Sequence, residues 1–184
     1  MKIYDFFFEN SEIMSIKKQT NLDKSLMNRD ELLKLEDTEL IKLCEIDFFK
    51  ATGPGGQKKN KTESAVRLTL RDLGISATAS EDRQQSVNRA RAIKRLRLQV
   101  ALELREPASM WNGQWDMNPK NSLYPLFAAC LLDHLEDNNW QVSEAAKALE
   151  LSTGKLIKLL AKSDTLWQHA NRQRQKSNLK PLKR

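Results

Sequence analysis

Cysteine and long hydrophobic runs are scarce in this sequence. Its only two cysteines, Cys44 and Cys130, lie far apart, which excludes a disulfide framework and any CxxC metal-ligand spacing. No apolar run approaches the roughly 20 residues that cross a bilayer. Asp5 interrupts the short apolar stretch of residues 3–8, which argues against a signal peptide. We therefore expect a soluble protein of a reducing compartment.

Residues that break regular structure are also few. The 184 residues include six glycines and five prolines, and 40% are hydrophobic, which indicates folded structure rather than disorder. This length suits one large domain or two small ones, and we expect two modest cores. Residues 1–25 show no sustained periodicity, and Met14 and Met27 are both plausible alternative starts, so a flexible N-terminal arm is expected.

Acidic residues are outnumbered by basic ones. The 31 Lys and Arg residues against 24 Asp and Glu residues give a formal net charge of +7. Such an excess favours a polyanionic partner, because clustered Lys and Arg gain affinity by releasing counterions from phosphates. Nucleic acid is the natural candidate.

The most informative segment is residues 53–57, with the sequence Gly-Pro-Gly-Gly-Gln. Its three glycines open backbone angles that other residues avoid and expose N–H groups, while Pro54 stiffens the entry. A P-loop would need a different spacing before Gly-Lys-Ser or Gly-Lys-Thr, so that alternative is excluded, whereas an ordinary glycine-rich turn stays open. A cluster of positive charge follows at once, in Lys58, Lys59 and Lys61.

This segment resembles the GGQ loop of class I peptide chain release factors and of their shorter, codon-independent relatives. The similarity extends beyond the loop, because Asn60 and residues 63–67 continue the family's pattern. A second block also resembles the family, with Glu81, Arg83, Gln85 and Asn88. One position departs from the pattern, since Lys59 stands where the family usually has a small apolar residue such as Val.

The resemblance implies an enzyme that hydrolyses the ester between a nascent peptide and tRNA, with Gly55, Gly56 and Gln57 as catalytic residues. In that family the Gln57 backbone N–H donates to the oxyanion of the tetrahedral intermediate, and the Gln57 side chain lines the pocket. Residues 53–61 contain no general base, and the only histidines, His134 and His169, lie far along the chain. The resemblance accordingly assigns the rest of the catalytic site to the ribosome and the tRNA, and we expect neither a cofactor nor a metal.

The sequence pattern around the loop predicts a small, mostly antiparallel sheet. We expect a short capped helix from residue 28, a strand between residue 41 and the loop, and strands over residues 65–70 and 75–79. Residues 86–105 carry Ala90, Ile93, Leu96, Val100 and Leu104 at helical spacing, which predicts a long helix packed on the sheet and ended by Pro107.

The same helix region is rich in positive charge. Between residues 83 and 97 there are six Lys or Arg and no acid. This pattern is typical of a solvated helix face, and it also fits a surface that faces RNA, which the neighbouring Lys cluster favours.

The C-terminal half reads as helical. Residues 107–122 resemble a linker, residues 123–135 an apolar helix, and residues 142–149 and 152–160 a helix pair with Ser152 or Thr153 as N-cap. The pair resembles a Fis-type helix-turn-helix, although Glu150 stands where many such motifs have Gly. A purely structural helical hairpin is as consistent with the pattern.

The last segment is basic and has no acidic residue after Asp164. We expect it to be disordered until it meets phosphate, and a merely solubilising terminus stays open. Codon-independent relatives have basic tails that lie in the empty mRNA channel of the small subunit, so the resemblance implies that location. The candidate RNA-binding residues of the whole chain are Lys58, Lys59, Lys61, Arg83, Arg89, Arg172, Arg174, Lys176, Lys180, Lys183 and Arg184.

Together these observations predict an α+β protein: an arm (1–25), a GGQ domain (26–106), a linker (107–122), a helical domain (123–167) and a basic disordered tail (168–184). Because only about 50 residues precede the loop, we expect no codon-reading domain. The leading hypothesis is a cytoplasmic, monomeric, ribosome-dependent peptidyl-tRNA hydrolase that binds large-subunit rRNA and rescues stalled ribosomes or free large subunits. The alternative is a non-catalytic RNA- or DNA-binding helix-turn-helix protein with a vestigial loop.

Overall fold

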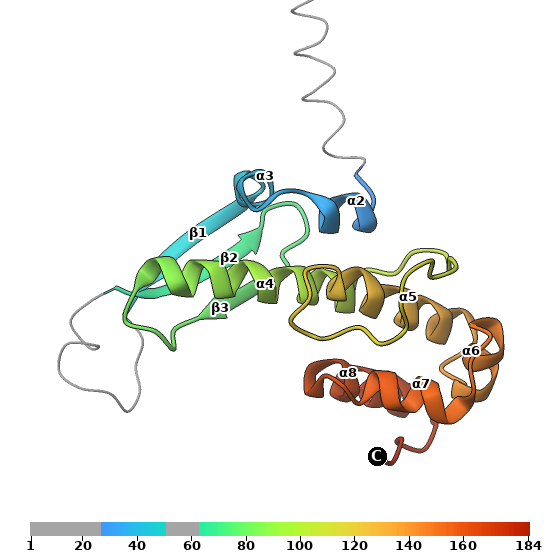
Figure 1. Cartoon of the computed structure of the whole chain (residues 1–184). Helices are drawn as coiled ribbons and strands as arrows, with labels where there is room; N and C mark the ends of the chain where they lie inside the picture. Colours follow the sequence, from blue (N-terminus) through green and yellow to red (C-terminus); the bar gives the residue numbers. More distant parts are fainter. Residues whose placement is uncertain (1–26, 51–62) are drawn as a thin grey trace, which may run out of the picture.

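A computed structural model describes residues 27–50 and 63–184, and its N-terminal lobe is built on a three-stranded sheet (Figure 1). The strands are β1 (Cys44–Phe49), β2 (Ala65–Leu70) and β3 (Ser76–Ala79), in the order β1-β2-β3. Both pairs are antiparallel. The predicted α+β class with a small antiparallel sheet is therefore confirmed.

Among the described residues, two short helices precede the sheet, α2 (Arg29–Lys34) and α3 (Asp37–Lys42). Asn28 begins α2 through a capping box, in which its Oδ1 accepts from the Glu31 N–H at 2.9 Å and its own N–H donates to Glu31 Oε2 at 3.2 Å. The prediction of a strand from residue 41 is wrong at its start, because Ile41 belongs to α3 and β1 begins at Cys44. The apolar residues around Ile41 pack at helical spacing before the alternation starts.

A long helix, α4 (Gln85–Glu103), lies along β2 and β3. Ile93, Leu96 and Val100 are buried against the sheet as predicted, but Ala90 is exposed. Ala92 and Ala101 are buried on this face as well. Leu104 is already extended (φ −97°, ψ 132°), so the helix ends before Pro107 and the prediction that Pro107 ends it is wrong.

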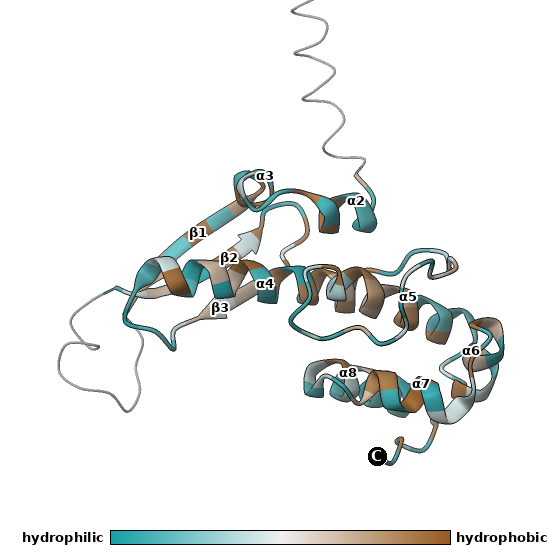
Figure 2. Cartoon of the chain, viewed as in Figure 1, coloured by the Kyte–Doolittle hydropathy of each residue, from teal (hydrophilic) through white to brown (hydrophobic). Residues whose placement is uncertain are grey.

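The C-terminal lobe consists of α5 (Tyr124–Asp137), α6 (Val142–Ala148), α7 (Thr153–Leu160) and α8 (Asp164–Lys176). Its core contains Phe127 and Leu131 of α5 and Leu156 and Leu160 of α7, all with no exposed surface. Figure 2 shows apolar residues along much of α5, which packs on both α4 and α6. Burial around its circumference explains why α5 is apolar on more than one face.

Residues 107–122 form no helix or strand, in agreement with their lack of periodicity, but they do not run free of the lobe. The Trp111 and Trp115 rings meet the Phe127 ring edge-on, with centroids 5.3 and 6.3 Å apart. Met117 is also buried. Edge-to-face aromatic contacts of this kind stabilise packing beyond the area they bury, so this segment belongs to the helical core.

The connection between α6 and α7 needs a left-handed backbone at Glu150, whose φ is +56°. The Leu151 N–H then donates to the Ala146 carbonyl at 2.8 Å. Ser152 caps α7 by accepting from the Lys155 N–H at 3.2 Å, which confirms one of the two predicted caps. The turn therefore has the left-handed backbone conformation that Gly adopts most easily, and in this chain Glu150 adopts it.

The prediction that residues 168–184 are disordered is wrong for residues 168–176, which continue α8. Leu166, His169 and Ala170 of this helix are buried in the lobe. The following residues pack too, since Leu179 and Leu182 lie against the same core. The basic composition hid a helix whose few apolar residues fall on one face.

Asp133 of α5 joins the two lobes through a buried ion cluster. Its Oδ1 lies 2.7 Å from Arg29 Nη1 and 3.0 Å from Arg105 Nη1, and it accepts from the Glu106 N–H at 3.3 Å. The Asp133 and Arg29 side chains are 2% and 3% exposed. Burial opposes the charge of Arg29, but its hydrogen bonds to the Asp133 and Asp30 carboxylates and the charges of these two groups outweigh burial and raise the Arg29 pKa.

His169 makes the stability of the C-terminal lobe dependent on pH. Burial, together with the charges of Arg105, Arg172 and Lys176, lowers the pKa of His169 to about 4. The unfolded chain therefore binds a proton more readily, and stability is lost as pH falls from the ordinary His value towards 4. We expect the free energy of unfolding to fall by about 2 kcal/mol between pH 7 and pH 5.

Urea unfolding at the two pH values measures this change, and a His169→Gln variant should lose most of it. An equal pH dependence in both proteins would contradict the assignment to His169.

In the part of the chain that the structure describes, no helix is both long enough and apolar enough to span a membrane.

Candidate functional site

Six of the predicted site residues lie outside the described residues. They are the catalytic Gly55, Gly56 and Gln57 and the RNA-binding Lys58, Lys59 and Lys61. The structure does describe both ends of the segment that carries them. Phe49, the last residue of β1, pairs with Ala65, the first residue of β2. The segment therefore leaves and re-enters the sheet at adjacent positions of two neighbouring strands (Figure 1).

Asn88 holds the point of re-entry. Its Nδ2 donates to the Ser64 carbonyl at 2.7 Å and to the Asp82 carbonyl at 2.9 Å, and its Oδ1 accepts from the Asp82 N–H at 3.0 Å. The residue has no exposed surface. Since all these groups are backbone polar groups in or near the interior, one side chain fixes the turn before α4 and the start of β2 together.

Gln85 adds a second tie one turn earlier on α4. Its Nε2 donates to the Glu63 carbonyl at 3.0 Å. Gln85 and Asn88 thus hold two consecutive residues of the re-entering chain, and we call this set of contacts the loop clamp (Gln85, Asn88, Glu63, Ser64 and Asp82). Asp82 is the member that sequence reasoning missed, because it contributes backbone groups that no side-chain pattern reveals.

Glu81 and Arg95 brace the same turn. Arg95 Nη2 lies 2.7 Å from Glu81 Oε1, and Arg95 Nη1 donates to the Thr78 carbonyl at 2.6 Å. Slight burial opposes ionisation of Glu81, but the hydrogen bond and charge of Arg95 and the backbone N–H groups of Ser80 and Glu81 together outweigh it and lower the pKa of this carboxyl. The structure therefore assigns Glu81 a structural role.

The basic side chains near the loop clamp differ in availability. Arg91 lies 3.4 Å from Asp82, and Arg97 donates to the Leu33 and Leu35 carbonyls. Within residues 27–50 and 63–184, no ion pair or hydrogen bond engages three exposed side chains, those of Arg83, Arg89 and Lys94. Arg83 lies in the turn before α4, Arg89 and Lys94 lie on α4, and all three cations are available to a polyanion.

The predicted RNA-binding residues of the C-terminus also separate into two groups. Arg174 donates to the Lys180 carbonyl at 3.1 and 2.8 Å and to the Trp140 carbonyl, and burial lowers its pKa. Arg184 pairs with Asp164. The exposed residues of the set that have no such partner among the described residues are Arg172, Lys176, Lys180 and Lys183.

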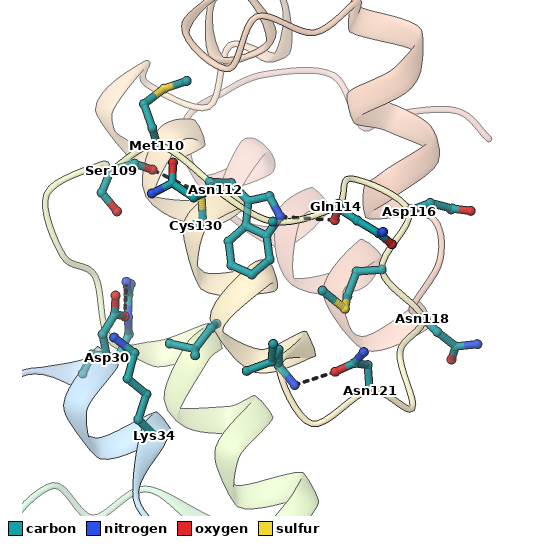
Figure 3. A pocket seen from close by; sticks show the side chains of 16 residues that line it. Asp30, Lys34, Ser109, Met110, Asn112, Gln114, Asp116, Asn118, Asn121 and Cys130 are labelled. Atoms are coloured by element: carbon teal, nitrogen blue, oxygen red, sulfur yellow. Dashed lines mark hydrogen bonds and ion pairs between the residues drawn. The ribbon is translucent and has the colours of Figure 1, made fainter.

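The two basic regions belong to different lobes, because Arg89 lies on α4, which packs on the sheet, whereas Arg172 and Lys176 lie on α8 of the helical lobe. Figure 1 shows α4 and α8 in these two lobes. A pocket of about 620 Å³ lies between α2, residues 109–123 and α5. Figure 3 shows Asp30 and Lys34 on one side of it and Asn112 and Gln114 on another. Its lining mixes both charges with neutral amides, so it selects no evident ligand chemistry.

Cys130 at this pocket is not a candidate nucleophile. Its Sγ donates to the Ser109 carbonyl at 3.3 Å, and burial raises the thiol pKa to about 12. The reactive thiolate is therefore essentially absent at neutral pH. Among the described residues, no group of three or more His, Cys, Asp and Glu side chains is placed to hold a metal ion.

The loop clamp makes a testable contribution to stability. Replacing Asn88 by Ala leaves the Ser64 and Asp82 carbonyls and the Asp82 N–H without this partner, so we expect the free energy of unfolding to fall by about 3 kcal/mol. Chemical denaturation measures the loss. The exposed Asn112 provides a matched control, and an Asn88→Ala loss no larger than that of Asn112→Ala would contradict the clamp.

Comparison with known proteins finds a family match that includes the sheet and α4 of the N-terminal lobe. Residues 34–115 match the RF-1 domain. A peptide chain release factor 1 from Acidiphilium cryptum is 48% identical over 64 residues, which cover 35% of this chain and 18% of that protein. A peptide chain release factor 2 from Campylobacter lari is 41% identical over 71 residues, covering 39% and 18%. One from Malacoplasma penetrans, a peptide chain release factor 1, is 39% identical over 93 residues, covering 49% and 23%.

The chain thus spans less than a quarter of the length of these relatives. The matched residues include the sheet, α4 and the whole loop clamp. All of α5 to α8 lies beyond them. Over residues 34–115 the chain is therefore similar to the RF-1 domain and to peptide chain release factors.

Proposed function

We propose that this protein hydrolyses the ester of peptidyl-tRNA on the ribosome and so releases the nascent chain. The observation that carries the proposal is the loop clamp, because it fixes the re-entry of a Gly-Pro-Gly-Gly-Gln segment within an RF-1 domain. Relatives that are similar to this chain over the same region are peptide chain release factors. The proposed substrate, peptidyl-tRNA, and the proposed partner, the ribosome, are inferred from that similarity.

The proposed reaction requires few catalytic groups from the protein itself. Water attacks the ester carbonyl, and the negative charge that develops on its oxygen requires a positioned hydrogen-bond donor. Residues 55–57 would provide that donor as the Gln57 backbone N–H, since the two glycines before it add no side-chain bulk. The ribosome and the tRNA would supply the remaining groups.

The loop clamp serves this chemistry by positioning. A donor displaced by about 1 Å from the developing oxyanion can lose on the order of a hundredfold in rate. Asn88 and Gln85 tie the chain at Glu63 and Ser64, a few residues after Gln57. Arg83 and Arg89, exposed beside the clamp, would contact rRNA phosphates and orient the lobe.

We further propose a codon-independent, rescue-type role in the cytoplasm. The resemblance to short codon-independent relatives supports it, together with the fact that α5 to α8 form a compact helical lobe with its own core. Such a factor acts wherever the peptidyl-tRNA is accessible, on a stalled ribosome or a free large subunit. Contact of the basic C-terminal residues with the small-subunit mRNA channel belongs to the same proposal.

The test is peptide release from purified complexes that carry labelled peptidyl-tRNA and either a stop codon, a sense codon or no codon in the decoding site. We expect release from all three at rates within a few-fold of one another. Gln57→Ala should slow release from each, whereas Gln141→Ala should not, since Gln141 is exposed and does not cap α6 through its side chain.

Two results would decide against parts of this proposal. Release confined to the stop-codon complex would contradict the rescue role and leave hydrolysis in place. Background release from all three complexes, with RNA binding retained, would favour the non-catalytic nucleic-acid-binding alternative.

A further inference from the structure

The exposed side of α8 and the chain that follows it enclose a groove of about 410 Å³. This volume is within the range of about 300–1,000 Å³ that ligand pockets occupy. The groove lies outside the residues that match the RF-1 domain, so it is independent of the proposed hydrolysis. Its lining residues are Trp167, Gln168, Asn171, Arg172, Gln175 and Pro181.

The far wall of the groove is held in place by hydrogen bonds. The Leu182 N–H donates to Asn171 Oδ1 at 2.7 Å. Arg174 donates to the Lys180 carbonyl at 3.1 and 2.8 Å. Hydrogen bonds to the residues before and after Pro181 thus hold it in place, and the groove is part of the folded lobe.

Its walls combine an aromatic ring with neutral amides. The half-buried Trp167 indole carries the Arg184 guanidinium over its ring, 5.3 Å from the centroid. Within the described part of the chain, no hydrogen bond engages the side chains of Gln168 and Gln175 or the amino group of Asn171. Nucleic-acid bases stack on aromatic rings and guanidinium planes and pair with amides through their edges.

The rim of the groove is positively charged. Arg172 lines it, and Lys176, Lys180 and Lys183 are exposed on α8 and the residues after it. No acidic residue follows Asp164, and Asp164 itself pairs with Arg184. Charge of one sign along an open surface favours a phosphate backbone.

We propose that this groove binds single-stranded RNA, with a base stacked against Trp167 in place of the Arg184 guanidinium and the adjacent phosphates held by Arg172 and Lys176. An acidic peptide would use the cations but leave the indole and the amides without a role. A duplex keeps its bases stacked on one another and presents none to a ring. The combination of an aromatic ring, free amides and cations therefore fits unpaired bases best.

The experiment measures fluorescence anisotropy of a labelled short single-stranded RNA of mixed sequence with the full chain over a range of salt. Trp167→Leu removes the ring without changing charge, and we expect binding to weaken about tenfold with an unchanged salt slope. Arg172→Gln should reduce the slope of log affinity against log salt by about 0.7. Lys120→Gln, which removes one exposed charge from the 107–122 segment, should leave the slope unchanged.

A matched abasic backbone separates stacking from charge, and it should bind about tenfold more weakly than the RNA. Trp167 also packs on the core, so circular dichroism must show that Trp167→Leu folds, and the exposed Gln168→Ala provides a second variant that should weaken binding. Equal affinity for the abasic strand, tighter binding of duplex DNA, or displacement of the RNA by polyglutamate at similar concentration would each overturn the proposal.

Discussion

Replacing Gly56 by alanine is expected to lower the rate of peptide release by about two to three orders of magnitude, while ribosome binding is retained. The loss of one oxyanion donor costs roughly 2.7–4 kcal/mol of transition-state stabilisation. Gly56 stands immediately before the residue whose backbone N–H is the proposed donor. A methyl group there restricts the backbone angles on which the donor's direction depends.

Gln57→Ala provides the informative comparison, because it keeps the backbone N–H and removes only the side chain. We expect it to be milder than Gly56→Ala in single-turnover release, with both variants bound to ribosomes to the same extent in co-sedimentation. The reverse order, with Gln57→Ala the more severe, would assign the chemistry to the side-chain amide and contradict the backbone account.

Replacing Asp133 by leucine is expected to lower the free energy of unfolding by about 3–5 kcal/mol, the usual range when one partner of a buried ion pair is removed. Arg29 then remains 3% exposed without its main counter-charge, and Arg105 loses the same carboxylate. Because Asp133 joins α2 and the end of α4 to α5, the loss should appear in both lobes at once.

Guanidinium unfolding followed by tryptophan fluorescence and by far-ultraviolet circular dichroism measures this effect. The double variant Arg29→Met with Asp133→Leu should recover part of the stability, since well-packed apolar pairs often replace buried ion pairs without loss. Asp137→Leu, an exposed position on the same helix, serves as the control. A loss from Asp133→Leu no larger than the control would contradict the role of the cluster.

Local patterns predicted the elements that depend on local physics. The alternation in residues 65–70, the spacing of Ile93, Leu96 and Val100, and the Ser152 cap all describe interactions within a few residues, and each was confirmed. The end of α4 was wrong because Leu104 leaves the helix to bring Arg105 and Glu106 to Asp133. That partner is remote in sequence, so no local pattern contains it.

The functional residues divide in the same way. Gly55, Gly56 and Gln57 stand out in the sequence, and their roles stay predictions. The roles of Gln85 and Asn88 became apparent only when α4 was placed beside the start of β2. Among the basic residues, charge alone did not separate Arg174, which holds the C-terminal chain, from Arg172, which is exposed.

The most direct test of the account is single-turnover peptide release at saturating protein, on ribosomes whose occupancy by the protein is verified by co-sedimentation. The account predicts rapid release by the parent chain and near-background release by equally bound Gly56→Ala. Background release by the bound parent chain, or equal release by both proteins, would contradict it.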